Sequence, residues 1–181
     1  MKKTLFITFT IIFSLNIHSQ HTENFLDLTK SLKPIDSSTI ISKYKNGNPK
    51  EIANYIKYKF GDYTYEFISG LYRNYLKDGT IFFEQKFDRF GNLLIQRQIN
   101  DKGEVYNLIK TEKIDTKSKS LKDFLDSKKS LLIYTKQYMM SENTGELFLW
   151  QERQELGGKK IGVWKTYNQC DEKVQLKDYS E

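Results

Sequence analysis

The stretch that decides the fold is Gly79-Thr80-Ile81, which returns as Gly91-Asn92-Leu93 and again as Gly103-Glu104-Val105. The spacing is twelve residues each time. Looser copies are Gly47-Asn48-Pro49 and Gly145-Glu146-Leu147. Glycine accepts a positive φ without a Cβ clash, which tight hairpin turns require. A twelve-residue unit holds one strand of roughly seven or eight residues and a short turn. The repeat therefore predicts a continuous antiparallel meander over residues 40–109.

Register within the repeat also predicts which side chains share a face of the sheet. Alternate residues of a strand point to the same side. Apolar residues follow each glycine at matching positions, so we expect both sets to lie on one face and that face to be the better buried. The sets are Ile81, Phe83 and Phe87 in the first unit, and Leu93, Ile95 and Ile99 in the second. A slip by one residue would expose all of them.

Other segments predict further strands and two short helices. Strand pairs are expected at residues 55–60 with 63–68, 130–140 with 146–153, and 161–167 with 173–179. A short helix is predicted within residues 23–33, because three apolar residues have helical spacing there before Pro34. Ser120 is placed to cap a second helix that carries Leu121, Phe124 and Leu125. The predicted fold class is mainly β, with one or two short helices.

The N-terminal residues are typical of an export signal. Lys2 and Lys3 precede an almost entirely apolar stretch that ends at Ile17. A stretch of about fourteen residues fits a signal-peptide core and is shorter than the ~20 residues that span a bilayer. We expect cleavage after Ser19, export to the periplasm or the extracellular space, and no membrane span in the mature chain. A retained N-terminal anchor is the alternative, although no positively charged stop-transfer flank follows Ile17.

Composition changes along the chain predict its organisation. The expected segments are a signal peptide (1–19), an N-terminal helix and linker (20–39), the N-terminal meander (40–109), a linker with a short helix (110–129) and C-terminal β-hairpins (130–181). Lys110 to Lys119 shows no periodicity, which predicts a solvated linker. Loss of Lys2 and Lys3 lowers the net charge from +6 to +4. The remaining charges are scattered, so no nucleic-acid partner is expected.

Residues that carry catalysis or bind metals are scarce. His21 is the only histidine of the mature chain, and we expect it to fray with the terminus, where it cannot serve as a base. Cys170 is the only cysteine, so no intramolecular disulfide forms and no zinc or copper ligand set is available. We therefore expect no enzymatic activity, no metal and no cofactor. The alternative is a hydrolase that uses two carboxylates near Trp150, as glycosidases do. The candidate acids are Glu142, Glu146, Glu152 and Glu155.

Aromatic residues of the C-terminal region are the candidate binding residues. They are Trp150, Tyr134, Tyr138, Trp164 and Tyr167. Exposed rings of this kind form a strip on which a sugar or a peptide stacks. The alternative is that these rings form the core of the C-terminal hairpins, and it is favoured for both tryptophans.

Two resemblances to known families follow from these residues. The segment Gly158-Lys-Lys-Ile-Gly162-Val-Trp164-Lys-Thr-Tyr167 resembles the Gly-x-x-x-Gly-x-Trp-x-x-Tyr core of a variant MORN repeat, found in many bacterial proteins, some of them described as antitoxins. Residues 44–51 and 75–81 resemble the Tyr-x-x-Gly-x-x turn of that family, whereas Asp171 stands where it usually has a second glycine turn. The resemblance implies an open, curved antiparallel sheet of stacked hairpins that contacts other molecules.

A second resemblance is more limited. Residues 87–93 resemble one unit of the tyrosine-aspartate repeats of large secreted shell proteins, in a chain far too short for a shell. The leading hypothesis is therefore a non-catalytic exported module that binds another protein in the cell envelope. An immunity or antitoxin role is a more specific form of it, which only the MORN resemblance suggests. The alternative function is carbohydrate or surface-polymer binding through the aromatic strip.

Overall fold

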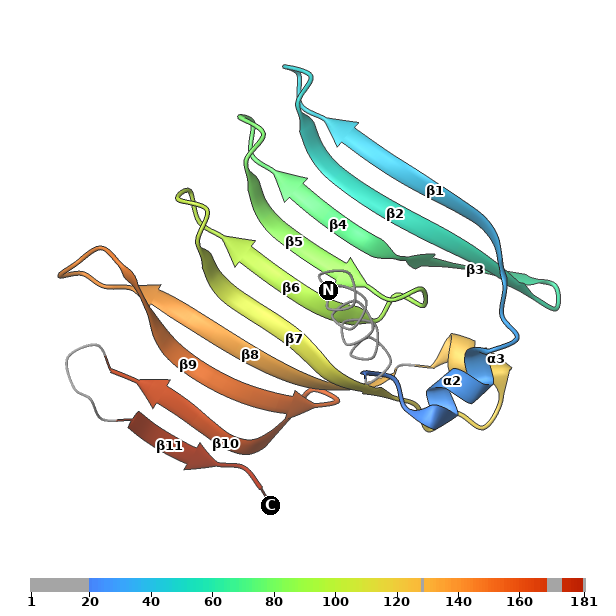
Figure 1. Cartoon of the computed structure of the whole chain (residues 1–181). Helices are drawn as coiled ribbons and strands as arrows, with labels where there is room; N and C mark the ends of the chain where they lie inside the picture. The colour runs from blue at the N-terminus through green and yellow to red at the C-terminus, as the bar shows by residue number, and fades with distance from the viewer. Residues whose placement is uncertain (1–19, 128, 169–173, 181) are drawn as a thin grey trace, which may run out of the picture.

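The computed structural model describes residues 20–127, 129–168 and 174–180, so the predicted signal peptide and Cys170 lie outside the described residues. One eleven-stranded sheet contains every strand, and each pair of neighbouring strands is antiparallel (Figure 1). The order β1-β2-β4-β5-β6-β7-β8-β9-β10-β11 follows the chain, and β3 pairs with β2 outside this path. The predicted open, mainly β meander is confirmed, and the two predicted β regions belong to the same sheet.

The element bounds agree closely with the expected hairpins. The strands are β1 (Pro34–Lys43), β2 (Pro49–Phe60), β3 (Tyr63–Ile68), β4 (Gly70–Tyr75), β5 (Ile81–Phe87), β6 (Leu93–Ile99), β7 (Val105–Asp115), β8 (Ser130–Met140), β9 (Leu147–Leu156), β10 (Lys159–Tyr167) and β11 (Val174–Asp178). The helices are α2 (Glu23–Thr29) and α3 (Leu121–Asp126). As predicted, Ser120 caps α3, because its hydroxyl accepts a hydrogen bond from the backbone N–H of Asp123.

Four hairpin turns share one construction, which explains the twelve-residue repeat. The turns are residues 44–48, 76–80, 88–92 and 100–104. In each, the first residue donates its N–H to the carbonyl of the fifth at 2.8–2.9 Å, and the glycine at the fourth position donates back to the first at 3.0–3.3 Å. The glycine φ angles lie between 77° and 95°, a region that strains other residues. The predicted reversals at Gly79, Gly91 and Gly103 are confirmed.

The predicted grouping of apolar residues on one face is wrong. Phe83 pairs with Gln98, and Lys86 pairs with Ile95. Paired residues share a face, and Phe83 is three positions from Lys86, so Phe83 and Ile95 point to opposite sides of the sheet. Neither side is clearly better buried, since nearly all residues of β5 and β6 are half-buried.

A bulge beside each turn causes this reversal. The registers skip one residue after each turn glycine, which leaves Phe82, Leu94 and Tyr106 without a partner. One extra residue shifts the alternation of the strand by one position and exchanges the faces beyond it. The bulge also separates Ile81 from Phe83 within β5. Strict alternation of side chains between the two faces, assumed from the sequence, does not predict this shift.

Two rows of side chains cross the sheet back to back. The charged row is Arg73, Glu84, Arg97, Leu108, Lys136, Glu152 and Lys165. The amide row is Asn74, Phe83, Gln98, Asn107, Gln137, Gln151 and Thr166. Each member of one row is the chain neighbour of a member of the other, so the rows lie on opposite faces. These faces are named the charged face and the amide face below.

The predicted linkers are partly wrong. The solvated linker expected from Lys110 is strand as far as Asp115, because β7 pairs with β8 over residues 107–115. Residues 34–39, expected to belong to a linker, form the first part of β1. Polar residues occupy both faces of these strands, so neither segment shows the alternation that marks a half-buried strand.

The hydrophobic core cluster includes side chains of both helices, which lie together at one end of the sheet (Figure 1). The buried cluster is Phe25, Leu32, Tyr58, Phe90, Ile114, Phe124 and Leu125. The ring of Phe124 packs edge-on against Phe25 and Phe90, with centroid distances of 4.9 and 5.4 Å. Such edge-to-face contacts add to the stabilisation that apolar burial supplies. The sheet therefore has its hydrophobic core at this end.

The segment before α2 is held against this core, so the prediction that His21 frays is wrong. The Nε2 atom of His21 lies 2.9 Å from an Oδ2 of Asp88. Gln20 donates from its side-chain Nε2 to the carbonyl of Thr111 at 2.8 Å. The backbone N–H of Thr22 donates to the carbonyl of Ile114 at 3.1 Å. These contacts fix the segment from Gln20 onward along β7.

Candidate interaction surfaces

Two of the predicted binding tyrosines meet at Glu152 on the charged face. The Tyr134 hydroxyl donates to Oε1 of Glu152, and the Tyr167 hydroxyl donates to Oε2 at 2.6 Å. The Nζ atom of Lys136 lies 3.2 Å from Oε1. These groups come from β8, β9 and β10, which the register aligns side by side. Tyr138, four residues after Tyr134 in β8, belongs to the same face.

Glu152 is a strongly held anion. Its side chain is 14 % exposed. Burial alone would raise its pKa, but the hydrogen bonds from Tyr134, Tyr167 and Lys136 outweigh burial and lower the pKa of Glu152 to about 2. Burial and the neighbouring carboxylate raise the pKa of the Tyr134 hydroxyl. A carboxyl group with so low a pKa is deprotonated near neutral pH and has no proton to give as a general acid.

The charged row contains a second cluster of the same design. Glu84 accepts hydrogen bonds from Nε of Arg73 and from Nη1 of Arg97, both at 2.8 Å. Burial opposes ionisation of Glu84, yet the two guanidinium groups lower its pKa. Each glutamate thus joins its strand to the strands on both sides.

The predicted binding residue Trp164 lies away from the tyrosine cluster. Trp164 precedes Lys165, which pairs with Glu152, so Trp164 points to the amide face. Its Nε1 donates to the carbonyl of Gln154 at 3.1 Å, and the Nζ atom of Lys160 lies 4.6 Å from its ring. The five predicted binding residues are therefore split between the two faces and do not form one strip.

Trp150 borders a hollow of about 320 Å³ at the outer end of β8–β10. Gln137 pairs with Gln151 and Tyr138 pairs with Leu149, so Trp150 of β9 has no paired residue in β8. The lining residues are Met139, Phe148, Trp150, Thr166, Tyr167, Asn168 and Gln175. Apolar rings next to amide and hydroxyl groups are suited to hold a sugar or a short polar segment. Of the five predicted residues, Trp150 and Tyr167 line this hollow.

Strand β1 forms one open edge of the sheet. All ten of its residues are exposed, and Ile35, Ile40 and Ile41 have exposed fractions of 57, 56 and 52 %. Ile40 and Ile41 are neighbours, so one apolar side chain points to each face. The unpaired N–H and C=O groups of an edge strand are a template for another chain. The expected meander begins at residue 40, so it includes Ile40 and Ile41 but not the first six residues of β1.

The opposite open edge is β11, which is half the length of β1. All five of its residues are exposed, including Val174 and Leu176. Strand β11 pairs with β10 over residues 163–167. Compared with β11, the edge strand β1 is longer and carries apolar residues on both faces.

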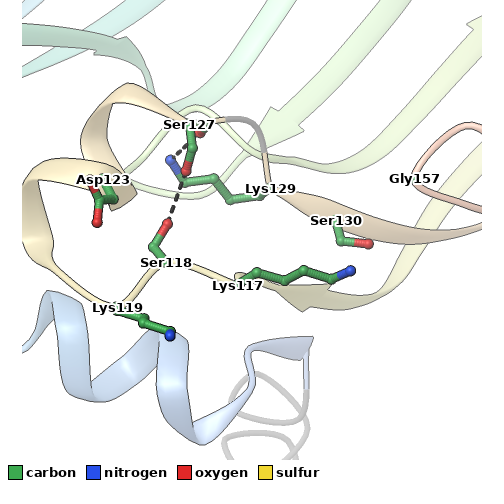
Figure 2. Close-up of a pocket in the computed structure, with 8 residues that line it drawn as sticks. All are labelled: Lys117, Ser118, Lys119, Asp123, Ser127, Lys129, Ser130 and Gly157. Atoms are coloured by element: carbon green, nitrogen blue, oxygen red, sulfur yellow. Dashed lines mark hydrogen bonds between the residues drawn. The ribbon is translucent and has the colours of Figure 1, made fainter.

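A second hollow, of about 600 Å³, lies beside α3 at the helix end of the sheet (Figure 2). Its lining residues are Lys117, Ser118, Lys119, Asp123, Ser127, Lys129, Ser130 and Gly157. They come from the β7–α3 connection, from α3 and the segment after it, and from the β9–β10 turn. The sequence does not predict this hollow, because its lining residues are far apart in the chain and come together only in the completed sheet.

Within the described residues, no group of three or more His, Cys, Asp or Glu side chains is arranged to hold a metal ion. The helices of the described part of the chain are all too short or too polar to cross a membrane. Comparison with known proteins finds no matching family model, no similar curated protein and no similar solved structure. The fold therefore defines the chain only as an open, single antiparallel sheet with two small helices at one end. Membership of the MORN family stays a prediction.

Proposed function

We propose that the protein is a non-catalytic exported interaction module that binds another protein in the cell envelope by adding a strand to β1. The observation that carries the proposal is the uncovered ten-residue edge of β1, which has exposed apolar side chains on both faces. A partner segment in extended conformation would hydrogen-bond to the free backbone groups and pack against Ile40 and Ile41. Long edges are usually blocked by central lysines or prolines, whereas β1 has Pro34 and Lys43 only at its ends.

The export and non-catalytic parts of the proposal rest on other observations. The basic and apolar pattern of residues 1–19 supports export. The tightly bonded state of Glu152 weakens the carboxylate-hydrolase alternative, because a glycosidase acid needs a raised pKa. Glu152 and Glu155 are three residues apart in β9, so their side chains point to opposite faces of the sheet. These two carboxylates therefore cannot act together on one substrate. Incubation with peptidoglycan and polysaccharides is expected to give no product.

The test uses the mature chain as bait in periplasmic and culture-supernatant fractions. Ile41→Lys places a charge in the apolar part of the β1 edge, and Leu176→Lys makes a matched change at the β11 edge. We expect the wild type and Leu176→Lys to recover the same protein and Ile41→Lys to lose it, with equal melting temperatures. Recovery of no specific protein would count against the proposal, as would equal losses in the two variants.

A toxin-neutralising role is the specific form of this proposal that the family resemblance suggests. An exported toxin encoded beside the gene would support it. The recombinant pair would then be expected to co-purify through β1, and the toxin to lose activity when bound. A neighbourhood without any toxin-like gene would remove this form and leave the general proposal in place.

Carbohydrate binding is the second candidate, and the hollow beside Trp150 favours it. Trp150 and Tyr167 supply ring surfaces there, and Asn168 and Gln175 supply amide groups. Glycan-array binding that disappears in Trp150→Ala, with an unchanged melting temperature, would support this candidate. If Trp150→Ala unfolds the protein instead, Trp150 acts as core and the candidate loses its basis.

A further inference from the structure

The hollow beside α3 carries a net positive charge. Its lining contains three lysines and one aspartate, which gives a net charge of +2. Within the described residues neither Lys117 nor Lys119 forms an ion pair. Asp123 is already engaged, since its Oδ2 accepts a hydrogen bond from the Ser120 hydroxyl at 2.7 Å. Figure 2 shows the Lys117 side chain extending toward Ser130.

The walls of this hollow are held in place by bonds between separate segments. Ser118 and Ser127 join the two sides, with their hydroxyl oxygens 2.9 Å apart (Figure 2). Asn24 of α2 donates from Nδ2 to the carbonyl of Thr116 at 2.9 Å, which fixes the connection that carries Lys117. On the far side, the N–H of Gly157 donates to the carbonyl of Leu131 at 3.0 Å. The hollow is thus part of the folded frame.

Lys129 occupies the inner wall of the hollow. Its Nζ atom donates to the carbonyl of Phe124 and, at 2.8 Å, to the carbonyl of Ser127. It also lies 4.0 Å from the centroid of the Phe124 ring. An ammonium group has three N–H donors, so one is left after these two bonds. Burial lowers the pKa of Lys129, and the carboxylates of Asp88 and Asp126 oppose this effect. A further anion bound beside Lys129 would also favour its charged form.

We propose that this hollow binds a phosphate group carried by a ligand of the cell envelope. A phosphate monoester carries close to two negative charges at neutral pH, which matches the net charge of the lining. Lysine ammonium groups bind phosphate as point charges, and serine hydroxyls donate to its oxygens. The volume of about 600 Å³ accommodates a ligand larger than the phosphate group alone. None of its lining residues belongs to β1, so the site does not depend on the strand-addition proposal, and only the envelope setting of the ligand rests on the proposed export.

The test measures binding of glycerol phosphate and inorganic phosphate to the mature chain by calorimetry and ³¹P NMR. Lys117→Gln/Lys119→Gln removes two lining charges, and Lys45→Gln/Lys77→Gln removes two exposed charges at the turns of the opposite end. We expect the first pair to weaken binding at least about tenfold and the second less than about twofold. Ser118→Ala/Ser130→Ala keeps every charge and is expected to weaken binding by about threefold to tenfold. Unchanged melting temperatures establish that each variant is folded.

Two further probes separate the sources of the phosphate group. Vesicles with phosphatidylglycerol, compared with neutral phosphatidylcholine vesicles, test a lipid headgroup against the free phosphates. Loss of vesicle binding in Lys117→Gln/Lys119→Gln, without binding of soluble phosphates, would assign the headgroup. No binding of any phosphate probe at millimolar concentration overturns the proposal. Equal losses in the two lysine pairs, or tighter binding of a poly-glutamate peptide than of the phosphates, would also overturn it.

Discussion

The part of the sheet that packs against the helices and the C-terminal strands β9, β10 and β11 have the same antiparallel pairing but are stabilised by different interactions. At the helix end, Phe25, Tyr58 and Phe124 are at most 1 % exposed and pack ring against ring. In β9, β10 and β11 no described residue is buried. There, the strands are joined by the hydrogen bonds of Glu152 and the packing of Trp164. An antiparallel meander can therefore extend beyond its core where polar side chains bond across the strands.

The largest effect is expected from Phe124→Ala. The change leaves a cavity in the buried cluster and should lower the free energy of unfolding by about 3–5 kcal/mol. Phe82→Ala is the matched change outside the cluster, because Phe82 is 38 % exposed, and it should cost less than about 1 kcal/mol. Urea unfolding followed by circular dichroism measures both. Similar losses would show that the stabilisation is not concentrated in the buried cluster.

The C-terminal end should respond to loss of a charge. Glu152→Gln is expected to lower the free energy of unfolding by about 1–2 kcal/mol at pH 7, less than the full pKa shift implies, because water partly screens the cluster. A lowered pKa stabilises the fold above the unfolded value near 4.5, and this stabilisation is lost as the pH falls toward 2. The difference between variant and wild type should therefore shrink over that range.

The control for Glu152→Gln is Glu146→Gln, at an exposed position in the neighbouring turn. It should change the free energy of unfolding by less than about 0.5 kcal/mol at any pH. Urea unfolding at pH 7, 4 and 2.5 provides the comparison. A constant loss for Glu152→Gln across this range would mean that its side chain acts through packing and not through its charge.

The smallest effect is expected at the four hairpin turns that share one construction, the last of which contains Gly103. Gly103 has a φ of +81° and open space around the position of a Cβ atom, so a substitution there tests the backbone alone. Gly103→Ala should cost about 1 kcal/mol, whereas Gly103→Asn should cost less, because asparagine tolerates this conformation better. Thermal unfolding of the two variants gives the ranking. If alanine matches glycine, the positive φ is not a constraint on the turn.

The glycine spacing was sufficient to predict the meander and its reversals, because each turn needs a residue that accepts positive φ. The faces of the strands could not be predicted from the same repeat. A bulge follows each of these glycines, and the residues that form it, such as Leu94 and Tyr106, look like ordinary strand residues. Alternation read through a bulge assigns every later side chain to the wrong side.

The candidate sites were harder to predict, since they depend on which strands become neighbours. The sequence marks Tyr134 and Tyr167 as binding candidates and Glu152 as a candidate acid, but nothing in it predicts that the two hydroxyl groups bond to this carboxylate. The hollow beside α3 is lined by residues 117–119 and by Gly157, which come together only when the sheet is complete. His21 was misjudged because the sequence near it shows nothing of Asp88, its partner across the fold.

Because the chain reverses at each turn, this sheet can gain strands only in pairs if the later strands are to keep their directions. An inserted twelve-residue unit would add one strand and reverse the direction of every strand after it. Two such units, twice twelve or 24 residues, would restore those directions and widen the sheet by about 10 Å. The helix-end core spans β2 to β7 and fixes the number of strands between them. Duplication is therefore compatible with the fold only beyond β8, where growth would move the β11 edge outward and leave β1 unchanged.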